Sequence, residues 1–266
     1  MNPKFEIVTS MNQAYYEKIG KEMLVSYIEK WPTNVHVRVY HEDKIQEILS
    51  DRLHYHNLFD CEPELKAFVE RHKDRPDQQN VLELHLGAIR FSYKTFSILN
   101  AGLNTQAQYL IWLDADTFTY NRITEEWLDT LVDESKYLTY LGRENNYSEC
   151  GFVIYNTYHP GHLAFQAAWR HLYTSDEVFQ LEQWHDSYVW DQVRLTYEKN
   201  DIIENINLSP WGKNYDHVFI NSELGKYMDH MKGPRKNEGK SRQSDLLSME
   251  SKGSSYDNYW EIPSRY

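Results

Sequence analysis

The sequence predicts an α/β fold with a mostly parallel central sheet flanked by helices, and two observations support this prediction. Residues 109–113, Tyr-Leu-Ile-Trp-Leu, form a short and almost wholly apolar run. Such a run is typical of a strand that is buried on both faces of a sheet. Near the N-terminus, residues 4–40 have the pattern of strand, helix and strand in succession, which is the unit that builds parallel sheets.

The elements of this first unit follow from local patterns. Residues 4–9 are predicted to be a strand because of their apolar content, and residues 15–30 a helix because apolar side chains recur along one stripe at helical spacing. Pro32 ends the helix, since the residue before a proline avoids the α region. Residues 35–40 alternate valine with polar residues and are predicted to be the second strand.

The rest of the chain continues the alternation of strands and helices. Residues 44–80 are polar and are predicted to be helical in pieces, whereas residues 82–101 carry apolar side chains every three or four positions and are predicted to be one helix. We further expect helices over residues 123–132, over 160–171 and from 184 onward, and strands over 137–141, 149–156 and 202–208.

Composition bounds the class of protein. Of the 266 residues, 41% are hydrophobic and 15% aromatic, which is ample for a core. The net charge of −12 argues against a protein that binds a nucleic-acid backbone along its whole surface. Two cysteines, Cys61 and Cys150, make neither a disulfide framework nor a zinc quartet. We find no signal-peptide pattern and no stretch approaching the about 20 apolar residues of a membrane span, so we expect a cytoplasmic protein.

Two carboxylates end the apolar strand. Asp114 and Asp116 follow residues 109–113, with the small Ala115 between them. In an open α/β sheet, ligands bind beyond the carboxyl ends of the strands. Two carboxylates there would form a hard oxygen site for Mg²⁺ or Mn²⁺ holding a substrate diphosphate. The alternative is an aspartate-rich turn, because aspartate is a common turn residue.

Other polar residues are expected near the same edge of the sheet. Thr9 ends the first predicted strand, and Glu42 follows the second. Arg90 and Lys94 are four residues apart and share one face of the predicted helix, which is either a solvated basic edge or a face directed at the strand ends. Gly151 precedes an apolar run, and either allows a close approach of the backbone to a ligand or forms a bulge.

A second motif occurs late in the chain. His230, Gly233 and Lys236 stand at three-residue spacing. Together with Asp114-Ala-Asp116, this pattern resembles the GT-A glycosyltransferases, and among them the retaining enzymes of glycosyltransferase family 8 and their relatives. Those enzymes carry an Asp-x-Asp motif and a late His-x-x-Gly-x-x-Lys motif. The resemblance covers roughly residues 4–236.

The resemblance implies a GT-A (Rossmann-like) domain and a metal-dependent glycosyltransferase activity. A sugar would move from a nucleotide diphosphate donor, most simply a UDP-sugar, to a hydroxyl acceptor with retention of configuration. We expect residues 1–233 to form this domain and residues 234–266 a polar, partly flexible tail. The aromatic residues Tyr256, Tyr259 and Trp260 offer an anchor for the end of the tail.

The resemblance also implies roles for individual residues. Asp114, Asp116 and His230 would hold Mn²⁺ (or Mg²⁺), because Mn²⁺ accepts a nitrogen ligand more readily than Mg²⁺. Around them, Gly233 and Lys236 would contact the diphosphate, Thr9, Tyr15, Glu42 and Ala115 the nucleoside side of the pocket, and Arg90 and Lys94 the phosphates and donor sugar. Glu149, Gly151 and Asp186 would lie at the donor sugar or the acceptor, with Glu149 and Asp186 as candidate catalytic residues. Asp186 alone would otherwise be explained as a helix N-cap.

Other classes of protein share parts of these patterns. A haloacid-dehalogenase-type phosphatase also has Asp-x-Asp after an apolar strand, but near its N-terminus and followed by x-Thr or x-Val, where this chain has Phe118. A carbohydrate- or nucleotide-binding module without catalysis is the non-enzyme alternative. We expect the acceptor to be a glycan or a small hydroxyl compound. The basic residues between 232 and 242 leave a nucleic-acid acceptor as a disfavoured alternative.

Overall fold

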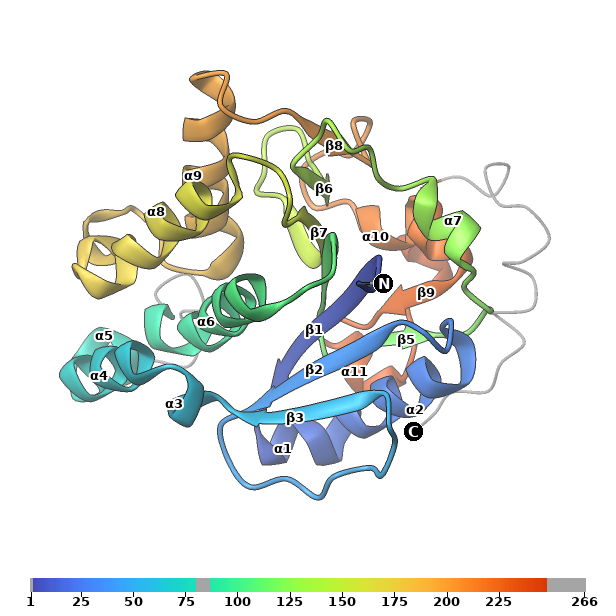
Figure 1. Ribbon diagram of the computed structural model, residues 1–266, viewed down its shortest axis with the longest axis horizontal. Coiled ribbons are helices and arrows are strands. Elements are labelled where there is room, and N and C mark those ends of the chain that lie inside the picture. Colours follow the sequence, from blue (N-terminus) through green and yellow to red (C-terminus); the bar gives the residue numbers. More distant parts are fainter. Residues whose placement is uncertain (1, 80–86, 248–266) are drawn as a thin grey trace.

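The computed structural model describes residues 2–79 and 87–247 of the chain. Its centre is a seven-stranded sheet with the order β3-β2-β1-β4-β7-β6-β8, covered by helices on both faces (Figure 1). The neighbouring strands from β3 to β4 are parallel, as are β6 and β8, whereas β7 runs antiparallel to β4 and β6. The predicted α/β fold with a mostly parallel sheet is confirmed. The strands are β1 (Phe5–Met11), β2 (His36–His41), β3 (Leu53–Asn57), β4 (Tyr109–Leu113), β6 (Leu138–Leu141), β7 (Glu149–Asn156) and β8 (Asn205–Asn207).

Two hydrophobic cores lie on opposite faces of the sheet. One contains side chains of α2 (Lys21–Lys30), α7 (Glu125–Asp129) and α10 (Val218–Asn221). The other contains side chains of α4 (Pro63–His72), α6 (Ala88–Asn104), α8 (His162–Thr174) and α9 (Asp186–Lys199). The short helical segments are α1 (Gln13–Tyr15), the π-helical turn Tyr16–Gly20, α3 (Leu58–Cys61), α5 (Pro76–Gln79), α11 (Arg235–Glu238) and the 3-10 turns Glu177–Gln180, Glu223–Lys226 and Gln243–Asp245.

Strand β4 is the centre of the sheet and contributes to both cores. Tyr109, Ile111 and Leu113 belong to the core of α2, and Leu110 and Trp112 belong to the core of α6. This division follows from the two-residue period of a strand, which sends successive side chains to opposite faces. Each of the five side chains is at most 2% exposed. The prediction that this strand is buried on both faces is therefore confirmed.

Most other predicted elements are confirmed within a few residues, but β3 was missed. The segment containing it was predicted to be helical in pieces, because its alternation of Leu53 and Tyr55 with histidines is too short to stand out. Its strand structure depends on parallel pairing with β2 at the edge of the sheet. The predicted helix over 82–101 corresponds to α6, which begins at Ala88; residues 82–86 lie outside the described part of the chain.

A second, two-stranded sheet joins the middle of the chain to its late segment. Strand β5 (Thr117–Thr119) pairs antiparallel with β9 (Met228–His230), so that Thr117 lies opposite His230. The backbone N–H of Met231 continues the contact by donating to the carbonyl of Asp116 at 2.9 Å. This pairing, which the sequence did not predict, carries His230 to the end of β4.

The carboxyl ends of β1, β2 and β4 lie along one edge of the sheet. The antiparallel β7 begins at this edge, because Asp114 donates its backbone N–H to the carbonyl of Gly151 at 2.9 Å. The chain runs outward from β1 to β2 and β3 and then returns to place β4 on the other side of β1. The crevice beyond such a reversal is the usual ligand-binding position of open α/β sheets. We call this edge the functional rim.

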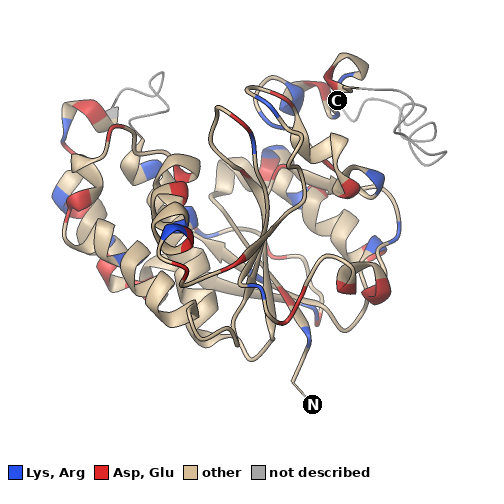
Figure 2. Ribbon diagram, turned by 90° about the horizontal axis from the view of Figure 1, so that it is seen from above, with Lys and Arg blue, Asp and Glu red and all other residues tan. Residues whose placement is uncertain are grey.

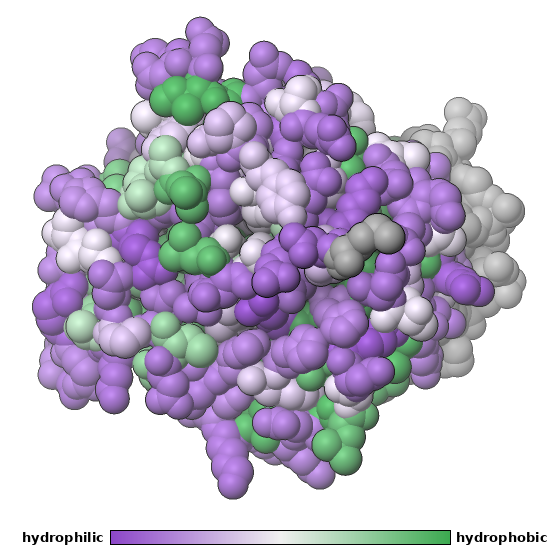
Figure 3. All heavy atoms as spheres, viewed as in Figure 1, coloured by the Kyte–Doolittle hydropathy of each residue, from purple (hydrophilic) through white to green (hydrophobic). Residues whose placement is uncertain are grey.

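The surface is mostly hydrophilic on the face shown in Figure 3, with small separate apolar patches. Acidic and basic residues are interspersed along the helices (Figure 2). Within the described residues, no helix combines the length and the apolar character that crossing a membrane requires.

The described start of the expected tail packs against the body. Ser241 is only 1% exposed and donates its hydroxyl to Asp229 at 2.6 Å, and the side chain of Asn221 donates to the carbonyl of Asp245 at 2.8 Å. The boundary at residue 233 stays a prediction. Residues 248–266, including the expected aromatic anchor at Tyr256, Tyr259 and Trp260, lie outside the described residues.

Candidate active site

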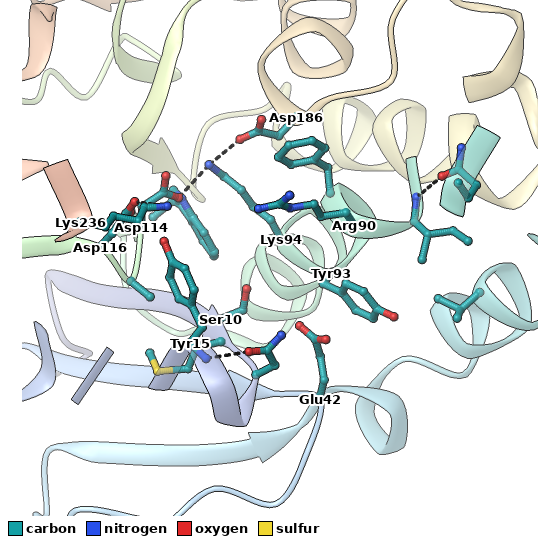
Figure 4. A pocket seen from close by; sticks show the side chains of 18 of the residues that line it. Ser10, Tyr15, Glu42, Arg90, Tyr93, Lys94, Asp114, Asp116, Asp186 and Lys236 are labelled. Atoms are coloured by element: carbon teal, nitrogen blue, oxygen red, sulfur yellow. Dashed lines mark hydrogen bonds and ion pairs between the residues drawn. The ribbon is translucent and has the colours of Figure 1, made fainter. Parts of the chain in front are cut away.

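A cleft of about 570 Å³ lies over the functional rim. Figure 4 shows acidic groups and Lys236 at one end of the cleft, Arg90, Lys94 and Asp186 along one wall, and Glu42 on the opposite side. The cleft therefore collects residues from β1, α1, the segment after β2, α6, β4, α9 and α11. The sequence-predicted residues that line it are Tyr15, Glu42, Arg90, Lys94, Asp114, Ala115, Asp116, Asp186 and Lys236.

Three potential metal ligands meet at the end of β4. Asp114, Asp116 and His230 each offer an atom within 4.8 Å of the others. Nε2 of His230 lies 3.1 Å from Oδ1 of Asp116 and 3.4 Å from Oδ2 of Asp114. Two carboxylates and one imidazole form a donor set that suits Mn²⁺, so the residues present fit the expected ion. Burial alone would raise the pKa of Asp116, but His230 and Lys236 outweigh it and hold that pKa well below its ordinary value.

Gly151 on β7 makes the space that the His230 ring occupies. A Cβ atom on Gly151 would lie only 2.4 Å from Cε1 of His230. The close approach expected at this glycine is therefore real, but its partner is a side chain of the protein. The register between β6 and β7 also shifts opposite this stretch, through a bulge or another irregularity of the pairing. Both features place the imidazole against the backbone of β7.

The carboxylate of Glu149 lies beside the other nitrogen of His230. Its Oε1 lies 3.2 Å from Nδ1 of the ring, and its Oε2 pairs with Lys232. Metal-binding histidines commonly give their second nitrogen to a carboxylate, which fixes the orientation of the ring. Burial alone would raise the pKa of Glu149, but Lys232 and His230 hold it well below its ordinary value. Glu149 is 4% exposed and is not among the residues that line the cleft, so its contact is with His230.

Lys94 joins two carboxylates on the wall of the cleft. Its Nζ lies 2.9 Å from Oδ1 of Asp114 and 2.8 Å from Oδ2 of Asp186, and it donates to the carbonyl of Cys150 at 2.7 Å. With 11% of its side chain exposed, Lys94 is not part of a solvated basic edge. Arg90, one turn earlier on α6, is exposed and lines the cleft.

The N-cap explanation of Asp186 is wrong. The cap of α9 is His185, whose Nδ1 accepts the backbone N–H of Tyr188 at 3.3 Å. Asp186 is the first residue of the helix, and its carboxylate is turned to Lys94 in the cleft (Figure 4). Because His185 caps the helix, the carboxylate of Asp186 is not needed as a cap and instead pairs with Lys94 in the cleft.

Lys236 brings the late motif over the two aspartates. Its Nζ lies 2.8 Å from Oδ2 of Asp116 and 4.9 Å from the centre of the Tyr15 ring. Burial and the neighbouring Asp116 raise the pKa of Tyr15 well above its ordinary value, so its hydroxyl stays protonated. Gly233 has a φ of +63°, and a Cβ there would meet no atom within 4 Å. A glycine is therefore favoured at 233 by the backbone conformation and not by lack of space.

The nucleoside side of the cleft differs from the expectation at one residue. Thr9 is fully buried in β1 and does not line the cleft; the following residues Ser10 and Met11 do. Glu42 lines the cleft, and burial together with Asp43 raises its pKa from 4.5 to about 7. A carboxyl with this pKa changes its charge near neutral pH.

Sequence reasoning missed Trp112. Its indole Nε1 donates to Oδ1 of Asp114 at 2.6 Å, on the face of β4 that also meets Lys94. A signal was present, since residues two apart on a strand share a face. Trp112 and Lys94 together fix Asp114 by its Oδ1, which leaves Oδ2 on the side of His230.

Comparisons with known proteins give a fold-level likeness only. No protein-family model and no curated protein sequence matches the chain. Mouse xyloside xylosyltransferase 1 in its apo form is similar over 77% of this chain and 84% of its own, with 11% identity and a TM-score of 0.49. The apo form of the glycosyltransferase GlyE of Streptococcus pneumoniae TIGR4 matches 77% of this chain and 45% of its own, with 15% identity and a TM-score of 0.43.

A third similar structure is a glycosyltransferase involved in the glycosylation of the major capsid of PBCV-1. It matches 88% of this chain and 98% of its own, with 12% identity and a TM-score of 0.46. Likenesses at these values establish neither a family nor an activity. The function is therefore inferred from the geometry and chemistry of the site.

Proposed function

We propose that this chain is a metal-dependent glycosyltransferase of the GT-A type, which moves a sugar from a nucleotide diphosphate donor, a UDP-sugar, to a hydroxyl acceptor. One observation carries the proposal. Asp116 and His230 are 114 positions apart in the chain, yet they meet beside Asp114 on the functional rim. Basic side chains, among them Arg90 and Lys236, line the same cleft.

This combination suits a diphosphate leaving group. Departure of a nucleoside diphosphate from the sugar places negative charge on phosphate oxygens, and a reaction of this kind needs that charge neutralised. Asp114, Asp116 and His230 would hold Mn²⁺, which supplies the positive charge when it is bound. Lys236, now paired with Asp116, lies where its ammonium would act as a point charge on the diphosphate. Arg90 contributes a second cation from α6.

The remaining predicted residues divide between the two ends of the donor. Tyr15, Glu42 and Ala115 line the part of the cleft near the ends of β1, β2 and β4, where the nucleoside would lie. Asp186, held by Lys94, would face the donor sugar or the acceptor. We propose that transfer occurs with retention of the anomeric configuration, which rests on the resemblance of residues 230–236 to the late motif of family 8.

A donor screen tests the proposal. Thermal unfolding would be followed with a panel of UDP-sugars and GDP-sugars, each with and without Mn²⁺, and released nucleotide would be measured for every sugar that stabilises the protein. A ligand at a hundred times its dissociation constant stabilises the fold by about 2.7 kcal/mol, which such a screen detects. Stabilisation with no nucleotide release would favour a binding module. Indifference to every nucleotide sugar, with phosphate released from simple phosphomonoesters, would favour the phosphatase alternative.

A further inference from the structure

A second pocket lies on the functional rim, beyond the start of β7. It has a volume of about 240 Å³, and its lining includes Arg143 and Glu144, which follow β6, and Asn207, the last residue of β8. β6 and β8 are parallel to β4, because both partners of β7 run against it. Their carboxyl ends therefore face the same side as Asp114, and the start of β7 separates the second pocket from the cleft.

The walls of the second pocket are held together by backbone contacts. The N–H of Glu144 donates to the carbonyl of Gly212 at 2.7 Å, and the N–H of Asn214 returns to the carbonyl of Glu144 at 2.8 Å. The hydroxyl of Ser209 donates to the carbonyl of Gly142 at 2.8 Å. Two loops that are far apart in the sequence thus form one preorganised wall, which lowers the cost of ordering them on binding.

Three side chains of the pocket keep hydrogen-bonding capacity. Asn207 uses its Oδ1 to accept the N–H groups of Gly142 and Ser209, each at 2.9 Å, and its Nδ2 has no acceptor within the described residues. Arg143 donates through Nε to the carbonyl of Tyr147 at 2.8 Å, and its Nη1 makes no hydrogen bond in the part of the chain described. Among the described residues, Lys213 is the one ion-pair partner of the Glu144 carboxylate, at 3.9 Å.

This set of groups points to a neutral hydroxylated ligand. An amide and a guanidinium donate hydrogen bonds and a carboxylate accepts them, which matches an array of sugar hydroxyl groups. Of the two arginines that line the pocket, Arg194 is already paired with Asp191 and Glu198, and Nη2 of Arg143 lies 3.9 Å from Glu149. The carboxylate of Glu144 adds a negative charge, so the pocket does not favour a phosphate or another anion. The volume is just below the range of about 300–1,000 Å³ for pockets that bind whole small molecules, so the pocket fits a single sugar unit.

A row of aromatic rings connects the cleft to the second pocket. Phe91, which lines the cleft, lies 6.3 Å from the ring of His185. The rings of His185 and Tyr147 are 4.9 Å apart, and those of Tyr147 and Tyr188 are 5.3 Å apart. All four are partly exposed, and Tyr147 stands between two residues that line the second pocket. Sugar rings pack their C–H faces against aromatic faces of this kind, where an apolar body meets water.

We propose that the second pocket and the aromatic row bind the acceptor, and that the acceptor is a neutral oligosaccharide of at least two sugar units. The inference rests on the proposed function for the donor cleft. β4 and β6 are separated by β7, and two strand spacings amount to roughly 10 Å, which is more than one sugar ring spans. An acceptor that reacts in the cleft and fills the second pocket must therefore have more than one sugar unit.

Saturation-transfer NMR on the full chain tests this directly. The probes are glucose, galactose and mannose, with maltose, lactose, cellobiose and mannobiose, each alone and with Mn²⁺ and UDP present. We expect at least one disaccharide to bind more tightly than its parent monosaccharides and to remain bound when Mn²⁺ and UDP fill the cleft. Glu144→Ala and Tyr188→Ala should each weaken its binding about tenfold, because each removes a direct contact. Tyr158→Ala, which alters an exposed tyrosine elsewhere, is the matched control.

Three results would overturn the inference: no saturation transfer from any probe, displacement of the sugar by Mn²⁺ and UDP, or unchanged binding in both Glu144→Ala and Tyr188→Ala. The measurement requires no turnover, so it is independent of the donor reaction. Oligosaccharide binding without any nucleotide release would refute the proposed enzyme and keep the binding site. Nucleotide release without oligosaccharide binding would support the proposed enzyme and refute the acceptor site.

Discussion

Replacing Gly151 by alanine should damage the metal site through a single, calculable clash. The added Cβ would lie 2.4 Å from Cε1 and 2.5 Å from Nδ1 of His230, whereas ordinary contacts begin at 3.4 Å. The ring or strand β7 must therefore yield by about 1 Å. The ring has little room to move, because carboxylate oxygens of Asp116 and Glu149 lie 3.1 and 3.2 Å from its two nitrogens. The centre of the Phe219 ring lies 5.3 Å from the centre of the imidazole.

The expected effects follow from this displacement. Overpacking of a core costs about 1–3 kcal/mol, which for a chain of this size lowers the melting temperature by roughly 2–4 °C per kcal/mol. Mutations that disturb the groups orienting a metal ligand typically weaken metal binding about 10–100-fold, and we expect a displaced His230 ring to fall in this range. We therefore expect Gly151→Ala to remain folded, to melt a few degrees lower, and to bind Mn²⁺ at least about tenfold more weakly in a calorimetric or electron paramagnetic resonance titration.

A double variant shows whether the effect passes through His230. His230→Ala removes the ring that the new methyl group strikes, so Gly151→Ala should cost less stability in that background than in the wild type. Wild-type Mn²⁺ affinity and stability in the single variant would refute the argument. Equal costs in the two backgrounds would show that the glycine serves some purpose other than seating the ring.

Stability, protection and stereochemistry give further tests. Burial raises the pKa of Glu42 from 4.5 to about 7, so the native state binds more protons than the unfolded chain between these values, and stability falls as the pH rises through this window. In urea unfolding, the free energy of unfolding of the wild type should fall from pH 5 to pH 8 by up to roughly 3 kcal/mol more than that of Glu42→Gln. A difference between the two proteins that is the same at both pH values would contradict this. Mn²⁺ and UDP together should protect residues 228–242 from hydrogen exchange more than either alone, and equal protection by one of them would count against a joint site. Proton NMR of the first product should show the donor's anomeric configuration, and an inverted product would exclude kinship with family 8.

The sequence was sufficient where a feature depends on nearby residues. The apolar run of β4 and the two aspartates after it lie within eight positions, so their burial and their place at the strand end could be predicted from local pattern. The same holds for α6, whose helical spacing placed Arg90 and Lys94 on one face. Lys94 proved to be an internal partner of Asp114, and its surroundings depend on α9, which no local pattern specifies.

Features that depend on contacts between residues far apart in the sequence could not be predicted. Strands β5 and β9 have three residues each, and they exist because Thr117 pairs with His230 across more than a hundred positions. Glu149 illustrates the same limit: its side chain contacts His230 behind the cleft, and a motif comparison gives no information on which side of the histidine a carboxylate lies. An error of one residue at the end of a strand exchanges a cleft residue for a buried one. Thr9 was predicted to contact the ligand, but Ser10 lines the cleft and Thr9 does not.

The most direct test of the proposed function compares Asp116→Asn with the wild type in UDP release from the UDP-sugar that the donor screen identifies. The wild type should release UDP with Mn²⁺ and stop when EDTA is added. The variant, whose fold should be checked by thermal unfolding, should lose at least about a hundredfold in rate, because Asp116 is both a metal ligand and the partner of His230 and Lys236. Undiminished release by Asp116→Asn, or by the wild type in EDTA, would show that Asp114, Asp116 and His230 are not the metal centre of a glycosyltransferase.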